Sequence, residues 1–481
     1  MARLSTMTSP SNDTAEEDLF SIKTSTKHIR VAVIGNVDAG KSTLIGTIKS
    51  GILDNGRGQS RLLITKYQHE LNSGRTSTIT THLVGYTEDG QPIQCLTNRI
   101  QSNARIQLKS DAAIAQEATN LVSLVDLAGH EKYLKTTIHG ISSGMVDYAL
   151  ILVNANDGPN HMTRHHISLA IAFGIPIVVV LTKTDNCPAH TLKQTKEEIV
   201  NIVRSPAVQK RPYQIKKVTD VAVVMDKMHA IAPVISMSSV SGEGIDLIHA
   251  LLSALPKRRR HQNKVGRSFE FLLQDIYNVT GAGTVVGGFV NAGKVRSGET
   301  VWVGPLRDGS YMKSVVKNIQ VYRTNVSSVI AGNSAGLSLA LTKDQRKMLR
   351  QGMVVLSQPS PATRTFEAEM IMIKGYGVDG TTIKVGYETM AHVLHIKQPV
   401  VVEDIKLLED EMGAQGFALG DEVVVRPGNR ARITFRFVKQ KEFVRPGMRI
   451  LFRDGHVRGV GVITLLKEEK DDEIVTLLNK L

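Results

Sequence analysis

Two glycines, a lysine and a serine stand at a spacing that can hold phosphate. They are Gly35, Gly40, Lys41 and Ser42 in VIGNVDAGKST, and they satisfy the pattern G-x-x-x-x-G-K-[ST]. Glycines let successive backbone N–H groups point inward, and a following helix adds partial positive charge, so a di- or triphosphate fits there. Lys41 would neutralise the β- and γ-phosphates, and the Ser42 hydroxyl would coordinate Mg²⁺. The apolar VAVI before the motif and TLIGTIK after it favour this interpretation over a simple glycine-rich turn.

A second motif, LTKTD, indicates the base. Asp185 follows the apolar run IPIVVVLT, and its carboxylate can accept both N1–H and N2–H of guanine, a donor pair that adenine lacks. Lys183 can lay its stem against the ring. Alone, T-K-x-D would be a surface turn, but behind a phosphate loop and at a strand end it predicts guanine. Ser238, Ser239 and Val240 end the next apolar run and can present backbone N–H groups to the guanine O6.

Between these motifs lies LVDLAGHEKY, which is typical of a switch. Asp126 ends an apolar run, where it can bind Mg²⁺ through water, and Gly129 can offer its N–H to a γ-phosphate only when one is present. His130 follows immediately, within reach of a water that attacks the γ-phosphate. A lone histidine is usually a surface or core residue. Directly after D-x-x-G, we predict that His130 orients that water in a mostly positional mechanism.

These motifs need a sheet to carry them, and the chain from Lys27 to about Leu255 supplies one. Apolar runs alternate there with amphipathic segments: HIRVAVIG, NLVSLVDLAG, YALILVNAND, IPIVVVLTK and APVISMSS. Near-continuous Val, Ile and Leu mark strands buried on both faces, and the segments between them have the length of crossover helices. The predicted fold class is therefore α/β, with a doubly wound, mostly parallel sheet.

Farther along, the pattern changes to short alternating strands broken by glycine turns. GAGTVVGGFVNAGKVRSGETVWVG is typical of a small closed antiparallel barrel, and GDEVVVRPGNRARITFRFV belongs to a second one. In the tail, Ile474, Leu477, Leu478 and Leu481 share one helical face. The predicted segments are a disordered N-terminus (1–26), a GTP-binding G domain (27–256), a basic linker (257–266), β-barrel domain II (267–361), β-barrel domain III (362–466) and a helical tail (467–481).

Composition limits the class of partner. The 481 residues carry a formal net charge of +14, and the densest basic cluster, KRRRHQNKVGR at 257–267, lies at the expected linker. Clustered Lys and Arg favour a polyanion because they displace counterions from phosphates, although a generally basic solvated surface is the alternative. Cys95 and Cys187 are too few for a disulfide framework or a zinc site, and no run approaches the roughly 18 apolar residues of a membrane span. We expect a cytoplasmic protein with no membrane partner.

The chain resembles the eukaryotic GTP-binding protein 1/2 family in ELNSGRTST, DLAGHEKYLKTTIHG, VVVLTKTDNCPA, GAGTVVGGF, RQGMVVLS and FRDGHVRGVGVI. This family is a branch of the translational GTPases of the elongation-factor-Tu and elongation-factor-1A type. The resemblance covers residues 28 to about 466. It implies a G domain with two β-barrels, GTP/GDP and Mg²⁺ as ligands, and GTP-dependent binding of aminoacyl-tRNA and the ribosome. For some members it implies a link to the mRNA-decay machinery and ribosome quality control. We expect a monomer.

The family's nucleotide-binding positions carry over with a few departures. In this class, the residue at Asp38 is associated with a monovalent cation near the phosphates. Leu127 and Ala128 stand where a Cys-Pro pair is usual. Thr182 replaces the commoner Asn of the guanine motif, and its hydroxyl can still tie the strand to the phosphate loop. The assigned phosphate loop is completed by Asn36, Val37, Asp38, Ala39 and Thr43.

In the first switch, the sequence pattern allows more than one candidate for the magnesium ligand. A threonine there normally binds Mg²⁺ and the γ-phosphate, but GRTSTIT offers Thr76, Ser77 and Thr78 within three positions. Counting back to the arginine of the related RGITI pattern selects Thr78, and counting from the glycine selects Ser77. We predict Thr78. The insertion at 88–120 resembles the longer connector of this branch, and we assign it no role.

Three functions compete. The leading one is a GTP-hydrolysing switch that binds aminoacyl-tRNA or the ribosome, in elongation or in ribosome-associated surveillance. The second keeps the switch but makes it a GTP-dependent adaptor in mRNA decay, without tRNA delivery. The third, a regulatory GTPase subunit in sulfate activation, shares the three-domain plan but fits the first-switch sequence poorly. A kinase is disfavoured because no acceptor-activating base follows the phosphate loop in a recognisable motif.

Overall fold

The apolar runs of the first half of the chain form one seven-stranded sheet in the order β2-β3-β1-β4-β5-β7-β6. The structure is a computed structural model that describes residues 27–65, 70, 79–93, 95, 108–129, 146–257, 262–279, 281, 283–372, 383–408, 418–419, 422–454 and 456–467. Only β2 runs antiparallel to its neighbour, so the predicted mostly parallel sheet is confirmed. The strands are β1 (Lys27–Gly35), β2 (Thr80–Tyr86), β3 (Asn120–Asp126), β4 (Tyr148–Asn154), β5 (Ile177–Thr182), β6 (Arg211–Gln214) and β7 (Ile231–Ser236).

Helices cover both faces of this sheet, which is why its strands are apolar on both sides. Along β1, Ile29, Val31 and Val33 join one buried cluster, and Ala32 and Ile34 join the other. The first cluster includes side chains of α2, α9 and α10, and the second includes side chains of α7 and α8. The helices are α2 (Lys41–Ser50), α3 (Gln59–Leu62), α5 (Asp111–Glu117), α7 (His161–Ala172), α8 (Ala189–Arg204), α9 (Val218–Met225) and α10 (Ile245–Ala254).

The glycine-punctuated strands that follow close into a first barrel, here called barrel II. Its strands follow one another as β11-β16-β8-β9-β15-β12, and β12 pairs back with β11. Phe271, Val303 and Leu337 lie in its fully buried core. The strands are β8 (Glu270–Val279), β9 (Gly283–Ala292), β11 (Thr300–Gly304), β12 (Met312–Val321), β15 (Ser334–Leu339) and β16 (Val354–Leu356), with β10 (Lys294–Arg296), β13 (Thr324–Val326), β14 (Ser328–Ile330), the short helix η3 (Gln262–Lys264) and α11 (Lys343–Met348) beside them.

A second closed barrel, barrel III, follows in the order β17-β22-β19-β18-β23-β24. Its core holds the rings of Phe366, Phe435, Phe437 and Phe452. Two closed antiparallel barrels after the α/β domain confirm the predicted fold class. The strands are β17 (Thr365–Met372), β18 (Glu388–Val393), β19 (Ile396–Leu407), β22 (Arg430–Phe437), β23 (Arg449–Asp454) and β24 (His456–Lys467), and a small hairpin pairs β20 (Ala418–Leu419) with β21 (Glu422–Val423). The predicted N-terminal segment 1–26 and nearly all of the predicted tail lie outside the described residues.

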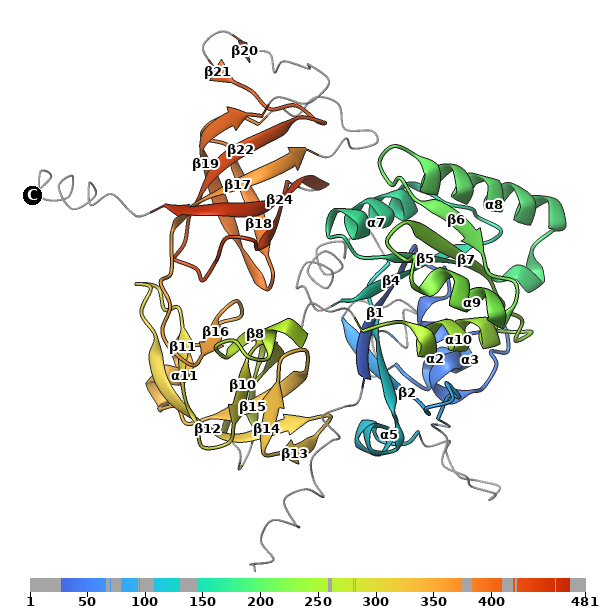
Figure 1. Cartoon of the computed structure of the whole chain (residues 1–481), viewed down its shortest axis with the longest axis horizontal. Coiled ribbons are helices and arrows are strands. Elements are labelled where there is room, and N and C mark those ends of the chain that lie inside the picture. Colours follow the sequence, from blue (N-terminus) through green and yellow to red (C-terminus); the bar gives the residue numbers. More distant parts are fainter. Residues whose placement is uncertain are drawn as a thin grey trace, which may run out of the picture.

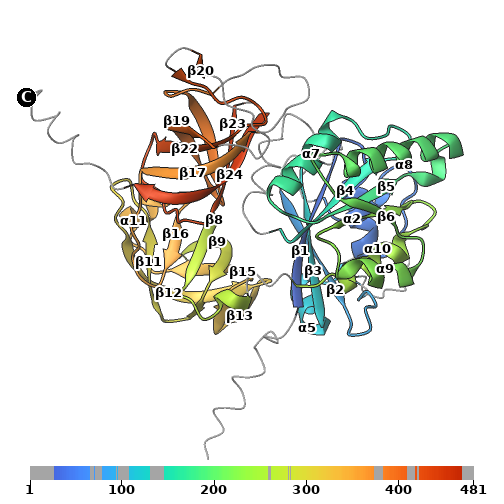
Figure 2. The same cartoon turned by 45° about the horizontal axis from the view of Figure 1, so that its top comes forward.

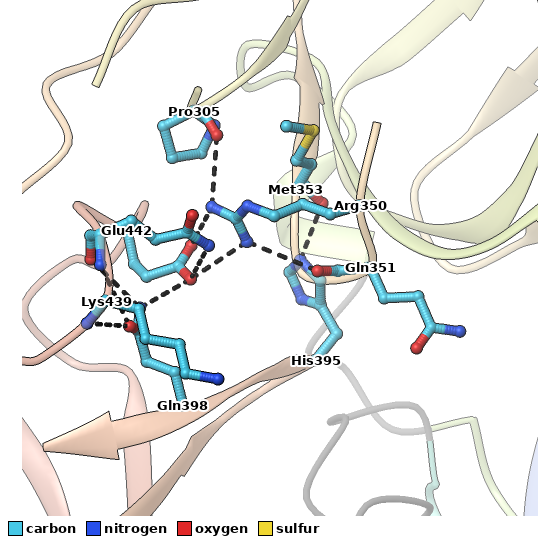
Figure 3. Close-up of polar contacts among 9 residues, drawn as sticks. Pro305, Arg350, Gln351, Met353, His395, Gln398, Lys439 and Glu442 are labelled. Carbon is cyan, nitrogen blue, oxygen red and sulfur yellow. Dashed lines mark hydrogen bonds and ion pairs between the residues drawn. The ribbon is translucent and has the colours of Figure 1, made fainter. Parts of the chain in front are cut away.

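The barrels stack beside the G domain and meet each other across a bidentate ion pair (Figures 1 and 3). Arg350 Nη1 and Nη2 lie 3.1 and 2.9 Å from the two carboxylate oxygens of Glu442. Gln398 Nε2 donates to the same carboxylate at 2.8 Å, and the Glu442 side chain is only 2% exposed. An apolar cluster from both barrels accompanies the pair: Leu272, Phe289, Val354, Leu356 and Phe443.

The G domain meets barrel II along β1. Arg30 Nη2 donates to Ser334 Oγ, and the Arg30 guanidinium lies 4.5 Å from the centroid of the Phe289 ring. The hydroxyl of Tyr322 lies 3.0 Å from His28 Nδ1. The strand that leads into the phosphate loop is therefore also the strand that contacts barrel II.

The G domain meets barrel III at α7, which faces that barrel in both views (Figures 1 and 2). Arg449 Nη1 donates to the carbonyl of Ala172 at 2.8 Å. Leu451 and Val460 of barrel III pack into the apolar cluster of α7 and α8. Within the described ranges, no helix combines the length and the apolar character needed to cross a membrane.

Candidate nucleotide-binding site

The phosphate-loop residues form a tight turn between β1 and α2, at the carboxyl end of a central parallel strand. Such strand ends are the usual ligand sites of open α/β sheets. Gly35 accepts no side chain, because a Cβ there would lie 2.5 Å from the carbonyl oxygen of Leu152. Gly40 caps α2 with a φ of 80°, and Asp38 also has a positive φ, of 60°. The backbone thus takes the left-handed turns that aim N–H groups at an anion.

Lys41 is held inside this turn. Its Nζ donates to the carbonyl of Asn36 at 2.7 Å, and its side chain is buried. Burial lowers the pKa of Lys41, and the carboxylates of Asp126 and Asp38 act in the opposite direction. The ammonium therefore sits in a poorly solvated place, where an incoming phosphate gains a stronger interaction than it would in water.

Ser42 and Asp126 converge from α2 and the end of β3. Ser42 Oγ donates to Asp126 Oδ2 at 2.6 Å, which places a hydroxyl and a carboxylate side by side. Hard oxygen donors of this kind suit Mg²⁺, which is usually bound by one or two protein oxygens together with phosphates and water. The donor set therefore fits the magnesium ion that accompanies nucleotides in this class of domain.

The guanine motif lies at the end of β5, next to the phosphate loop. Thr182 Oγ1 donates to the carbonyl of Ala39 at 2.9 Å, so the hydroxyl ties β5 to the loop as expected from the sequence. Lys183 has a left-handed φ of 58°, which turns the chain into the short helix η2 (Thr184–Asn186). The Asp185 side chain lies within that helix and is exposed, so its carboxylate is accessible to a ligand.

The loop after β7 lies beside this motif. Ser238 is fully buried, and its Oγ accepts from the N–H groups of Val240 and Ser241, each at 3.1 Å. The N–H of Ser238 donates to the carbonyl of Glu243 at 2.9 Å. Two of the three N–H groups predicted to meet the guanine O6 are thus engaged within the loop.

These segments enclose one pocket of about 450 Å³. Of the residues predicted from sequence, it brings together Val37, Asp38, Gly40, Lys41, Ser42, Thr43, Gly129, Thr182, Lys183, Asp185, Ser239 and Val240. Gly35, Asn36, Ala39, Asp126 and Ser238 support this wall through the contacts given above. Gly129 is confined, because a Cβ there would lie 2.3 Å from Lys41 Nζ. His130 and the first-switch candidates Thr76, Ser77 and Thr78 lie outside the described residues.

The pocket also contains residues that the sequence motifs did not predict. They are Asp54, Gly56, Arg57, Gly58, Arg61 and Asn186. Asn186 follows the guanine motif directly, but the other five come from the segment after α2. Four of these five lie in the stretch DNGRG, in which two glycines flank an arginine, and Arg61 lies in the short helix α3 that follows.

Comparison with known proteins agrees with this geometry. Residues 26–257 match the family model "Elongation factor Tu GTP binding domain", and residues 283–356 match "Elongation factor Tu domain 2". Among solved structures, translation elongation factor SelB from Methanococcus maripaludis with the GTP analogue GppNHp superposes with a TM-score of 0.62 at 20% identity, covering 93% of this chain and 81% of that one. A bacterial selenocysteine-specific elongation factor EF-Sec gives a TM-score of 0.60 at 20% identity, covering 95% and 61%.

Curated relatives are more similar in sequence. GTP-binding protein 2 of Mus musculus and of Homo sapiens are each 34% identical over 444 residues, which cover 91% of this chain and 69% of the relative. GTP-binding protein 1 of Xenopus laevis is 34% identical over 448 residues, covering 92% of this chain and 64% of the relative. The matched domains define a GTPase of the translational, elongation-factor-Tu type, which binds GTP and GDP and hydrolyses GTP. Within that class, the chain belongs to the GTP-binding protein 1/2 family.

Proposed function

We propose that the chain is a GTP-dependent switch that binds aminoacyl-tRNA and the ribosome in its GTP state, and that it acts as a monomer in the cytoplasm. The observation that carries this proposal is that β1 leads into the phosphate loop and also contacts barrel II. A change at the nucleotide can therefore alter how the barrels sit on the G domain. The net charge of +14 supports an RNA partner. The elongation factors that share the fold support the same class of partner.

In this proposal, different residues of the pocket bind different parts of the nucleotide. Lys41 would bind the β- and γ-phosphates, and Ser42 and Asp126, whose side chains lie together, would hold Mg²⁺, Asp126 through water. The metal would neutralise charge that develops on the phosphates. Asp185 reads guanine through its carboxylate, and Lys183 packs against the ring.

The switch itself is assigned to three groups. Gly129 donates its N–H to the γ-phosphate, Thr78 adds a magnesium ligand, and His130 orients the attacking water. A monovalent cation near Asp38 completes the proposed site. Loss of the γ-phosphate removes the partners of Gly129 and Thr78, and tRNA release follows in the GDP state.

The base assignment is tested with Asp185→Asn. Replacing the carboxylate removes two charge-assisted hydrogen bonds, so we expect GTP affinity to fall at least about a hundredfold while affinity for xanthosine triphosphate rises. Asp226→Asn is the matched control, because Asp226 lies at the end of α9 and does not line the pocket. Unchanged GTP selectivity in Asp185→Asn would refute the assignment.

The role of His130 is tested by single-turnover hydrolysis. Misplacement of a reacting group costs about a hundredfold in rate, so His130→Ala should retain GTP affinity and lose about a hundredfold or more in stimulated hydrolysis. His229→Ala, an exposed histidine before β7, is the control. Undiminished turnover in His130→Ala would remove that residue from the mechanism.

The cellular role is tested by measuring GTP hydrolysis by the purified protein with ribosomes and aminoacyl-tRNA, using ATP as the control nucleotide. Strong stimulation specific to GTP supports the proposed switch on the ribosome. Tight GTP binding without ribosomal stimulation, and with no salt-sensitive tRNA binding in the GTP state, would contradict it. That result would favour a GTP-dependent adaptor in mRNA decay instead.

A further inference from the structure

The segment after α2 is a compact turn organised by one buried carboxylate. Asp54 Oδ2 accepts from the N–H groups of Gly56 and Gly58 at 2.9 and 3.0 Å, and Asp54 Oδ1 accepts from the N–H of Ser60 at 2.9 Å. Gly56 and Gly58 both have a positive φ, of 78° and 83°. Asp54 is buried, with 7% of its surface exposed, and its carboxylate accepts all three bonds. The residue between the two glycines, Arg57, is thereby held on an outward bend.

This turn is fixed to the guanine side of the pocket. The N–H of Asp54 donates to the carbonyl of Ser239 at 2.8 Å, across a long separation in sequence. The side chain of Leu53 lies against Gly242, where an added Cβ would be 3.3 Å from Leu53 Cδ1. The turn is therefore attached to the loop after β7, which forms part of the pocket wall.

Two arginines of the turn line the same pocket as the phosphate loop. Four cationic side chains line that pocket: Lys41, Arg57, Arg61 and Lys183. Lys41 comes from the phosphate loop and Lys183 from the guanine motif, which leaves the two arginines without an assigned role. Arg61 folds back over the turn, since a Cβ at Gly58 would lie 3.0 Å from Arg61 Nε. Arg57 is exposed and can reach a ligand.

We propose that Arg57 binds phosphate oxygens of the guanine nucleotide, and that Asp54 is the positioning residue that holds Arg57 there. The inference rests on the proposed nucleotide site and adds a contact that its motifs do not contain. A guanidinium matches two phosphate oxygens at once, whereas the ribose offers only neutral hydroxyls. The guanine ring already has Asp185 for its donor edge, so the polyphosphate is the part of the ligand that a second cation serves best.

The experiment compares GTP, GDP and guanosine binding to the full chain by calorimetry. Guanosine has the base and the ribose but no phosphate. Arg57→Ala should weaken GTP and GDP binding about tenfold or more, because a hydrogen bond to a charged group is lost, and should leave guanosine binding unchanged. Arg57→Lys should recover part of the loss. Arg204→Ala, an exposed arginine at the end of α8, is the matched control.

Two outcomes overturn the contact. Unchanged GTP and GDP binding in Arg57→Ala would show that Arg57 does not touch the phosphates. An equal loss for guanosine would show that Arg57 acts on the base or ribose instead. Lys41→Ala separates this failure from failure of the whole site: if it abolishes GTP binding while Arg57→Ala has no effect, only the inference falls. If Lys41→Ala also leaves GTP binding intact, the site itself is wrong.

The positioning role of Asp54 is tested by a double-mutant cycle. Asp54→Asn keeps the size of the side chain but weakens the three N–H bonds. If Asp54 acts through Arg57, the double variant Asp54→Asn/Arg57→Ala should bind GDP no more weakly than Arg57→Ala alone. Additive losses, or a loss that includes guanosine, would show that Asp54 only stabilises the fold. Retained far-ultraviolet circular dichroism confirms that each variant is folded.

Discussion

The two joints that involve barrel II are built from different interactions. Towards barrel III, Arg350 forms an ion pair with the buried carboxylate of Glu442, and apolar side chains of both barrels form a buried cluster. Towards the G domain, Arg30 is more deeply buried than Arg350, but it meets a serine hydroxyl and the face of Phe289, and its Nη1 has no hydrogen-bond partner among the described residues. Separation of the barrels would expose the apolar cluster, whereas separation from the G domain releases a poorly satisfied cation to water. The joint to the G domain is therefore the one that costs less to open.

The largest effect is expected from breaking the ion pair between the barrels. Arg350→Ala leaves Glu442 buried without its cation, which should lower the free energy of unfolding by about 4 kcal/mol. Burial already raises the pKa of Glu442, and Arg350 acts against that rise. Urea unfolding followed by the fluorescence of Trp302, the chain's single tryptophan and a residue of β11, measures the change. The double variant Arg350→Met/Glu442→Leu should restore most of the stability, and a loss below 1 kcal/mol in Arg350→Ala would contradict the comparison.

Acid should weaken the joint to the G domain. Burial, together with the nearby charge of Arg30, holds the pKa of His28 well below 6.5. Below pH 6.5 the unfolded chain therefore binds a proton at His28 more readily than the folded chain does. The stabilisation is present above pH 6.5 and is lost as the pH falls below that value, by at most about 1.4 kcal/mol for each pH unit. His28→Asn should remove this part of the pH dependence. His166, whose pKa burial lowers to about 3, adds an equal slope to both proteins and cancels when their unfolding is compared across pH.

The hydrogen bond across the same joint should have a smaller effect. Tyr322→Phe removes the hydroxyl that lies 3.0 Å from His28 Nδ1, while His28 keeps its bond to Ser123 at 2.8 Å. We expect a loss of about 1 kcal/mol, the usual net value for one neutral hydrogen bond. Tyr277→Phe, on the exposed end of β8, is the control for removal of a phenolic hydroxyl. A loss of 3 kcal/mol or more would mean that this joint is as costly to open as the other.

The smallest effect is expected at Arg30 itself. Arg30→Met places an apolar side chain against Phe289 and removes a cation whose Nη1 has no hydrogen-bond partner within the described ranges. The free energy of unfolding should change by less than about 1 kcal/mol, in either direction. Thermal unfolding of Arg30→Met beside Arg350→Met measures the contrast between the joints directly. Equal losses of stability in Arg30→Met and Arg350→Met would contradict the difference between the two joints.

Sequence patterns predicted those parts of the molecule that neighbouring residues determine. The run VAVIG forms the end of β1, and α2 begins within GKST, as the sequence predicted. Both elements could be predicted because local periodicity and glycine turns determine them. The edge strands β2 and β6 were not predicted, since TTHLVGY and RPYQ lack the continuous apolar character of the central strands.

The part of the site that sequence missed depends on contacts between distant segments. Asp54 reaches the pocket through a backbone bond to Ser239, and no local pattern encodes that pairing. The same reason limits the prediction for the loop after β7. Its N–H groups look equivalent in sequence, but in the structure the N–H of Val240 donates to the buried hydroxyl of Ser238. Motif spacing does not predict which of these groups form hydrogen bonds within the loop, because those bonds form only in the folded chain.

Gly46 on α2 lies against the turn that lines the nucleotide pocket, so it bears on how long a nucleotide stays bound. A Cβ at Gly46 would lie 2.2 Å from the carbonyl oxygen of Ser60, so the helix and the turn that carries Arg57 can approach each other only because that position has no side chain. A glycine inside a helix costs about 1 kcal/mol relative to alanine, a cost that the close approach offsets. A side chain at Gly46 would displace the turn that carries Arg57, and we expect it to change the residence time of the nucleotide from a position outside the pocket.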